Sequence, residues 1–158
     1  MRRELSFVLA LVVVVGLSAC ALFTAQETPT LTVRDPVLMV GNWEVVISVS
    51  NLSEGLAGIQ ITHGGITTEG VDKTTVVASG MSGFIVTAQD FVAPEPEGTL
   101  MAVNPEQSIT SGKILKLTFK ASGSGPVVTL DKSKVTLMTD QGTLVGSWAL
   151  ATASDDAP

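Results

Sequence analysis

The sequence predicts an all-β domain, a β-sandwich of jelly-roll type with about nine or ten strands. Apolar and polar residues alternate with a period of two in several segments. Gly, Pro, Asn and Asp punctuate the chain roughly every eight to fifteen residues between those segments. Val, Ile and Thr, which favour strands, are abundant, and no segment has a convincing helical period. We therefore expect one two-layer domain from Leu31 to about Leu150.

The clearest strand is Trp43–Ser50, and Leu115–Phe119 and Val135–Leu137 alternate in the same way. Each has one apolar and one polar face, as in antiparallel sheets with one wet side. We expect Leu117 and Phe119 to point between the two sheets. The other expected strands are Leu31–Val33, Ala57–Thr62, Thr74–Ala78, Phe84–Gln89, Thr99–Val103, Val127–Leu130 and Thr143–Trp148.

Three glycines are expected to have specific backbone roles. Gly41 and Gly142 stand where tight turns require a positive φ, and Asp140-Gln141-Gly142 fits a hairpin turn. Gly58 follows Ala57 at the start of a strand, where a side chain could obstruct the close approach of another backbone segment.

The first twenty residues are typical of an exported lipoprotein. Basic Arg2 and Arg3 precede an apolar stretch, Phe7–Leu17, which ends in small residues, as in a secretory signal. The stretch is shorter than the roughly 20 residues that span a membrane. Leu17, Ser18, Ala19 and Cys20 resemble the lipobox of bacterial lipoproteins, which implies that the Cys20 thiol is lipidated. The alternatives are an ordinary secretory signal and a short membrane anchor.

The resulting organisation has four parts. Residues 1–19 form the expected signal peptide, residues 20–30 a lipidated tether, residues 31–150 the sandwich and residues 151–158 a disordered tail. Lipid chains on Cys20 would hold the protein at a membrane. We therefore expect an extracytoplasmic, membrane-anchored lipoprotein of the cell envelope or cell surface.

The charge of the chain limits its partners. It carries 9 basic and 15 acidic residues, a formal net charge of −6. An acidic protein of this kind is not suited to nucleic acid or to docking on anionic lipid headgroups. Contact with the bilayer is therefore expected through the lipid anchor alone.

Few side chains suit catalysis. His63 is the one histidine, and nothing in the sequence singles out a nucleophile that it could activate or a group that could orient it. Glu95 and Glu97 flank Pro96 and fit a solvated loop better than a pair with a raised pKa. We expect no catalytic residues and no enzyme activity.

Metal sites have little support in the sequence. One histidine and a lipidated cysteine cannot supply a zinc site. Calcium, which takes oxygen ligands, stays possible, although no calcium-loop motif is present. Its candidate carboxylates are Glu69, Asp72, Asp90, Asp131 and Asp140. Apart from the lipid on Cys20, we expect no cofactor and no metal.

Trp43 and Trp148 are the only tryptophans and the possible ligand-binding aromatics. Strict alternation places Trp43 on the face of Val45, which favours the core. Trp148, near the end of the last expected strand, fits either the core or the surface. The absence of tyrosine weakens a flat aromatic platform for sugars.

Two stretches together resemble the cohesin domain and the related carbohydrate-binding modules of its superfamily. The first comprises Val40-Gly41, Glu44–Ser53 and Gly55–Thr62, and the second comprises Gly112–Ala121, Val127–Leu130 and Val135–Gly142. Cohesins have a Val-Gly turn before a strand ending in Ser-Asn, a Gly-Ile-Ala-Gly opening of the next strand, and a late strand before a Leu-Thr-Asp hairpin. The resemblance covers about Leu31–Trp148 and implies a jelly-roll sandwich.

One departure from the family concerns its partner. Cohesins continue with a Tyr-Asp-Pro segment that helps to shape the dockerin-binding face, whereas this chain has His63–Gly70 there. The resemblance thus implies the fold but identifies no dockerin-contact residue.

The predicted function is a non-catalytic binding or scaffolding module of cohesin-like type for an extracellular protein. One alternative is a carbohydrate-binding module that recognises a polysaccharide. Another is a structural subunit of an envelope complex, which would expose an apolar patch near Val46, Val76, Val77 or Ile114.

Overall fold

The computed structural model describes residues 27–69, 75–87, 91–92, 99–120 and 125–154. The expected signal peptide, the lipobox Leu17–Cys20, and the carboxylates Asp72, Asp90, Glu95 and Glu97 lie outside these residues. The described residues form thirteen strands and one short 3-10 helix. None of their helices is long and apolar enough to cross a membrane.

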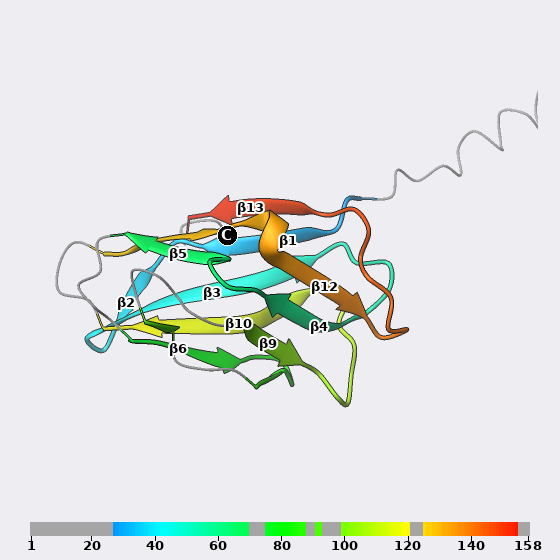
Figure 1. Ribbon diagram of the computed structural model, residues 1–158, viewed down its shortest axis with the longest axis horizontal. Helices are drawn as coiled ribbons and strands as arrows, with labels where there is room; N and C mark the ends of the chain where they lie inside the picture. Colours follow the sequence, from blue (N-terminus) through cyan, green and yellow to red (C-terminus); the bar gives the residue numbers. More distant parts are fainter. Residues whose placement is uncertain (1–26, 70–74, 88–90, 93–98, 121–124, 155–158) are drawn as a thin grey trace, which may run out of the picture.

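The larger sheet has seven strands and contains both ends of the described chain (Figure 1). Its order is β13 (Ala149–Ala153), β1 (Thr30–Arg34), β3 (Asn42–Ser50), β10 (Gly112–Phe119), β6 (Thr75–Gly80) and β8 (Phe91–Val92), with β2 (Val37–Met39) also paired to β3. All neighbours are antiparallel except β1 and β13, which are parallel. This parallel pair joins the first and last strands.

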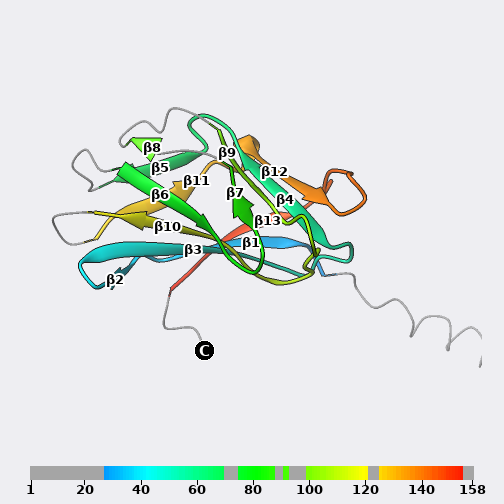
Figure 2. The ribbon, with the colours of Figure 1, turned by 90° about the horizontal axis from the view of Figure 1, so that it is seen from below.

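A four-stranded antiparallel sheet stacks against the larger one (Figure 2). Its order is β12 (Val135–Thr139), β4 (Leu56–Ile61), β9 (Leu100–Val103) and β7 (Ile85–Val86). A separate pair, β11 (Val127–Leu130) and β5 (Ile66–Glu69), adds buried side chains to the core, and η1 (Lys132–Lys134) leads into β12. The predicted all-β sandwich is confirmed.

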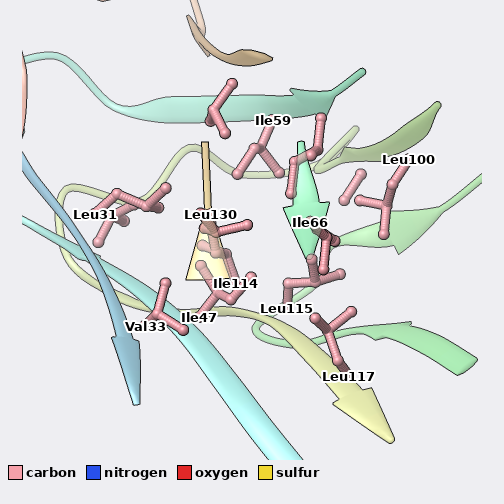
Figure 3. Close-up of a cluster of buried hydrophobic side chains, with 14 of the residues drawn as sticks. Leu31, Val33, Ile47, Ile59, Ile66, Leu100, Ile114, Leu115, Leu117 and Leu130 are labelled. Atoms are coloured by element: carbon pink, nitrogen blue, oxygen red, sulfur yellow. The ribbon is translucent and has the colours of Figure 1, made fainter. Parts of the chain in front are cut away.

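The core lies between the sheets and is built by strand alternation. Leu117 and Phe119 are fully buried there, as predicted. Ile59 and Leu100 of the four-stranded sheet face Ile47 of β3 across the core (Figure 3). Full burial of one such side chain contributes about 1.5–3 kcal/mol.

A β-bulge in β10 changes which side chains face inward. The pairing with β3 shifts register between Lys113 and Leu115, so that Ile114 is an extra residue without a paired residue on β3. Ile114 and Leu115 are consecutive, yet both are fully buried. The expectation that Ile114 contributes to an outer apolar patch is therefore wrong.

The end of the chain differs from the prediction. Thr143–Trp148, an expected strand, makes only an isolated bridge between Leu144 and Met138. The strand comes next, as β13, so that residues 151–153 of the expected tail are paired with β1. Pairing with a neighbour outweighs the weak strand propensity of this alanine-rich segment.

The turns confirm two predicted glycine positions. Val40 and Gly41 join β2 to β3 with φ of 47° and 81°, both positive as in a type I′ turn. Gly142 has φ of 74°, and its N–H donates to the carbonyl of Thr139 at 3.1 Å. The hydroxyls of Thr139 and Thr143 lie 2.7 Å apart and close the same hairpin turn.

Candidate functional site

An apolar row crosses the outer face of the four-stranded sheet. Leu144 bridges Met138 of β12, and Met138 pairs with Gly58 of β4. Gly58 pairs with Val103 of β9, and Val103 pairs with Ile85 of β7. Paired residues of antiparallel strands have side chains on one face. These five residues, here called the apolar row, therefore lie side by side although they are far apart in the sequence.

The row points away from the core. Leu144 is 65% exposed and Ile85 is 55% exposed, whereas Met138 and Val103 are partly exposed. Their strand neighbours with the opposite parity, such as Ile59, are buried. Single exposed apolar residues are ordinary on a protein surface, but a contiguous set is typical of an interaction surface.

Gly58 keeps the middle of the row flat. A Cβ atom there would lie 2.8 Å from Cε of Met138 and 3.6 Å from the carbonyl oxygen of Ala102. The predicted close backbone approach at Gly58 is wrong, because the carbonyl oxygen of Ala102 is at an ordinary contact distance and the crowding comes from the flexible side chain of Met138. Methionine is flexible and polarisable, so its side chain can adapt to a second surface.

Polar groups border the row along the sheet. Gln60 of β4 pairs with Thr136 of β12 on one side and with Met101 of β9 on the other. Beyond β7, the Thr87 hydroxyl donates to the carbonyl of Met101 at 3.3 Å. An apolar centre with polar neighbours is the usual composition of a protein-protein interface.

Asn104, at the end of β9, fixes two turns beside the row. Its Nδ2 donates to the carbonyl of Ser82 at 3.0 Å, in the turn that leads to β7. Its Oδ1 accepts from the backbone N–H groups of Glu106 at 3.2 Å and Gln107 at 3.0 Å. The prediction missed this buried residue, although Asn followed by Pro after an apolar strand is a turn signal.

The two tryptophans lie away from the row. Trp148 is only 7% exposed, and Nζ of Lys132 lies 4.9 Å from its ring centroid and donates to its carbonyl oxygen. Trp43 is half-buried and packs against the core. Gly125 lies against its ring, since a Cβ atom at Gly125 would be 3.0 Å from Cη2 of Trp43. Trp148 therefore offers no exposed platform for a sugar.

His63 is exposed in the turn between β4 and β5. The turn is closed by the N–H of Gly65, which donates to the carbonyl of Thr62 at 2.8 Å. Gly64, which follows His63, has a φ of 68°, and a Cβ atom there would lie 2.7 Å from Nζ of Lys134. This environment is that of a surface turn.

The described calcium candidates have separate surroundings. Asp131 accepts from Ser133 Oγ at 2.7 Å and Ser133 N at 3.0 Å, and these bonds, the hydroxyl first, lower its pKa. Asp140 accepts from Ser108 Oγ at 2.8 Å, and Glu69 ends β5. Among the residues that the structure covers, no three His, Cys, Asp or Glu side chains form a group that could hold a metal.

Comparison with known proteins supports the fold. No protein-family model and no curated protein matches the chain. CaCohA2, a cohesin solved at pH 5.5 in a complex with a variant of CaDoc0917, has a TM-score of 0.54 and 16% identity over 80% of this chain and 96% of that one.

Two other cohesin structures are similar at lower scores. The cohesin module of a Clostridium perfringens family 33 glycoside hydrolase has a TM-score of 0.48 and 11% identity over 80% of this chain and 97% of its own. A non-cellulosomal cohesin from the archaeon Archaeoglobus fulgidus has a TM-score of 0.45 and 11% identity over 81% of this chain and 88% of its own. The cohesin-like fold rests on the first structure, and it agrees with the predicted resemblance.

Proposed function

We propose that the protein is a non-catalytic module that binds another protein through the apolar row, held outside the cytoplasm by a lipid on Cys20. The row carries this proposal, because the exposed or partly exposed side chains of Leu144, Met138, Val103 and Ile85 lie on one face of the sheet, with buried Gly58 between Met138 and Val103. The similar CaCohA2 structure is itself a complex with another protein, which supports a protein as the partner.

The row suits a flat partner surface. Ile85, Val103 and Leu144 expose branched apolar side chains, and Met138 can adjust to the shape it meets. A few such residues carry most of the energy of an interface. Replacing one of them by a carboxylate should therefore prevent docking while leaving the core untouched.

The binding proposal is tested with the purified protein as bait for an extract of the cell envelope. Wild type, Val103→Asp and Ile85→Asp are compared, with Val127→Asp as the matched control because Val127 is 57% exposed on β11, outside the row. We expect a partner retained by wild type and the control and lost by both row variants. Equal capture by all four baits would contradict the proposal.

The carbohydrate-binding alternative is distinguished from protein binding with variants of the same purified protein. Burial of Trp148 leaves half-buried Trp43 as its remaining aromatic candidate. Binding to a polysaccharide array that is lost in Trp43→Ala and kept in Val103→Asp would favour that alternative.

Lipidation is tested separately by labelling cells with an alkyne-bearing fatty acid. The expected label on the wild-type protein should disappear in Cys20→Ala, which has no thiol to acylate. An unlabelled wild type, or an equally labelled variant, would refute the anchor.

A further inference from the structure

An open pocket of about 500 Å³ adjoins one end of the apolar row. Its walls come from three segments: residues 27–29 before β1, residues 52–54 after β3, and the β12 turn region, with Thr139 at the end of β12 and residues 143–147 after it. Leu144 belongs both to the pocket wall and to the row. A partner that lies along the row and passes Leu144 therefore enters the pocket.

The charged side chains of the pocket are all acidic. Glu27 and Glu54 line it, and its described lining contains no Lys, Arg or His. Asp140, which follows Thr139 at the end of β12, is not part of the lining, and its carboxylate accepts from Ser108 Oγ at 2.8 Å. At its other end β12 is preceded by Lys132 and Lys134 of η1. Nζ of Lys132 donates to the carbonyl of Trp148, the residue after pocket-lining Ser147, so this ammonium group lies near the part of the wall that Ser147 forms.

Half of the remaining lining residues carry hydroxyl groups, and the other half are apolar residues or glycine. The residues with hydroxyls are Thr28, Ser53, Thr139, Thr143 and Ser147. The hydroxyls of Thr139 and Thr143 lie 2.7 Å apart, and the Thr139 hydroxyl also accepts from the N–H of Thr143 at 3.3 Å. Carboxylates and hydroxyls are the acceptors that an ammonium or guanidinium group needs when it leaves bulk water.

We propose that the pocket receives a lysine or arginine side chain of the protein partner whose apolar residues pack on the row. This inference rests on the proposed function and adds the chemistry and orientation of the partner. The basic residue is expected beside Glu27 and Glu54, away from Lys132, whose ammonium group lies at Trp148 next to pocket-lining Ser147. Attraction between these charges favours association and weakens as salt is added.

The test uses phage-displayed random peptides of about 16 residues, long enough to span several strands. They are selected on the full-length purified protein. We expect the selected peptides to combine apolar residues with at least one Lys or Arg. Each purified peptide is then titrated against wild type and variants at low and high salt.

Glu54→Lys should lower the affinity of the protein for these peptides by about tenfold, which is the scale of the interaction of a close charge pair. Glu69→Lys is the matched control, since Glu69 is also an exposed glutamate but ends β5, away from the pocket. A peptide whose basic residue is changed to Glu should bind wild type more weakly. The same peptide should bind the Glu54→Lys variant more tightly than the original peptide does. Glu54→Gln, which keeps the side-chain size, should reduce the salt dependence.

The two proposals fail in different ways. Some peptides could fail to bind Val103→Asp but bind Glu54→Lys with the same affinity as wild type. That result would overturn the proposal that the pocket receives a basic residue and would leave the proposal for the row intact. A selection that gives no peptide sensitive to Val103→Asp would overturn both. Thermal melts of each variant establish that it is folded before binding is compared.

Discussion

Val40 has an unfavourable backbone conformation at a fully exposed position. Its φ is 47°, and its side chain is 100% exposed in the turn before Gly41. A β-branched residue is rarely found in the left-handed region, and type I′ turns favour Asn before Gly. Val40 therefore destabilises its own turn and gains no burial in return.

Val40→Asn should raise the free energy of unfolding by about 1 kcal/mol, since Asn tolerates the left-handed region. That gain corresponds to a rise of roughly 4 °C in melting temperature for a domain of this size. Val77→Asn is the control, because Val77 is exposed within strand β6 and should gain nothing. An unchanged or lower melting temperature for Val40→Asn would contradict the turn assignment.

Asp131 begins η1 as its N-cap and makes stability depend on pH. The Ser133 hydroxyl and then its N–H lower the Asp131 pKa below the ordinary value of 3.8. A carboxyl whose pKa is lower in the folded state stabilises the fold above its unfolded pKa. This contribution disappears as the pH falls through the folded pKa.

Asp131→Asn should therefore be less stable than wild type near neutral pH, with a difference that shrinks as the pH falls below the ordinary carboxyl pKa of 3.8. Urea unfolding at several pH values measures this, and Ser133→Ala should change the pH dependence in the same direction. A difference between wild type and Asp131→Asn that is constant across pH would contradict the capping role.

At the scale of elements, Asn104 links β9 to the turn before β7. Asn104→Ala would leave the Ser82 carbonyl and the N–H groups of Glu106 and Gln107 without their partner. Losing these bonds should cost about 2 kcal/mol in unfolding free energy. Gln107→Ala, at an exposed neighbour, should change it by less than about 0.5 kcal/mol, and an equally small effect of Asn104→Ala would argue against the link.

The strands that alternate strongly were predictable, and the others depended on their neighbours. Trp43–Ser50 was predicted within one residue of β3, because its burial alternates with its sequence. β13 was missed because Ala-Leu-Ala-Thr-Ala has no strong strand signal before it is paired with β1. The burial of Ile114 depends on a bulge, which strict alternation does not describe.

The apolar row was not predictable from the sequence for a related reason. Ile85, Val103, Met138 and Leu144 each lie in or beside an expected strand, but their common face depends on the strand order and register. Of the residues of the row only Gly58 was singled out in the sequence, and its crowding by the side chain of Met138 depends on the pairing of β4 with β12. The pocket likewise combines three segments that are distant in the sequence.

At the scale of the whole molecule, stability depends on one apolar layer between the sheets. Phe119 is fully buried at the end of β10, so Phe119→Ala should cost about 3–5 kcal/mol in unfolding free energy. Val127→Ala removes an exposed side chain and is the matched control. Urea denaturation compares them, and a cost for Phe119→Ala below about 1 kcal/mol would contradict this packing.

The parallel pairing of β1 and β13 determines how the domain bears mechanical load. A pull on the chain before Thr30 and after Ala153 draws the two strands in opposite directions along their common axis. The five residue pairs between them, from Thr30–Ala149 to Arg34–Ala153, are then loaded in shear and share the force. Antiparallel end strands pulled in the same way would instead separate one pair at a time, so this sandwich resists extension between its two termini.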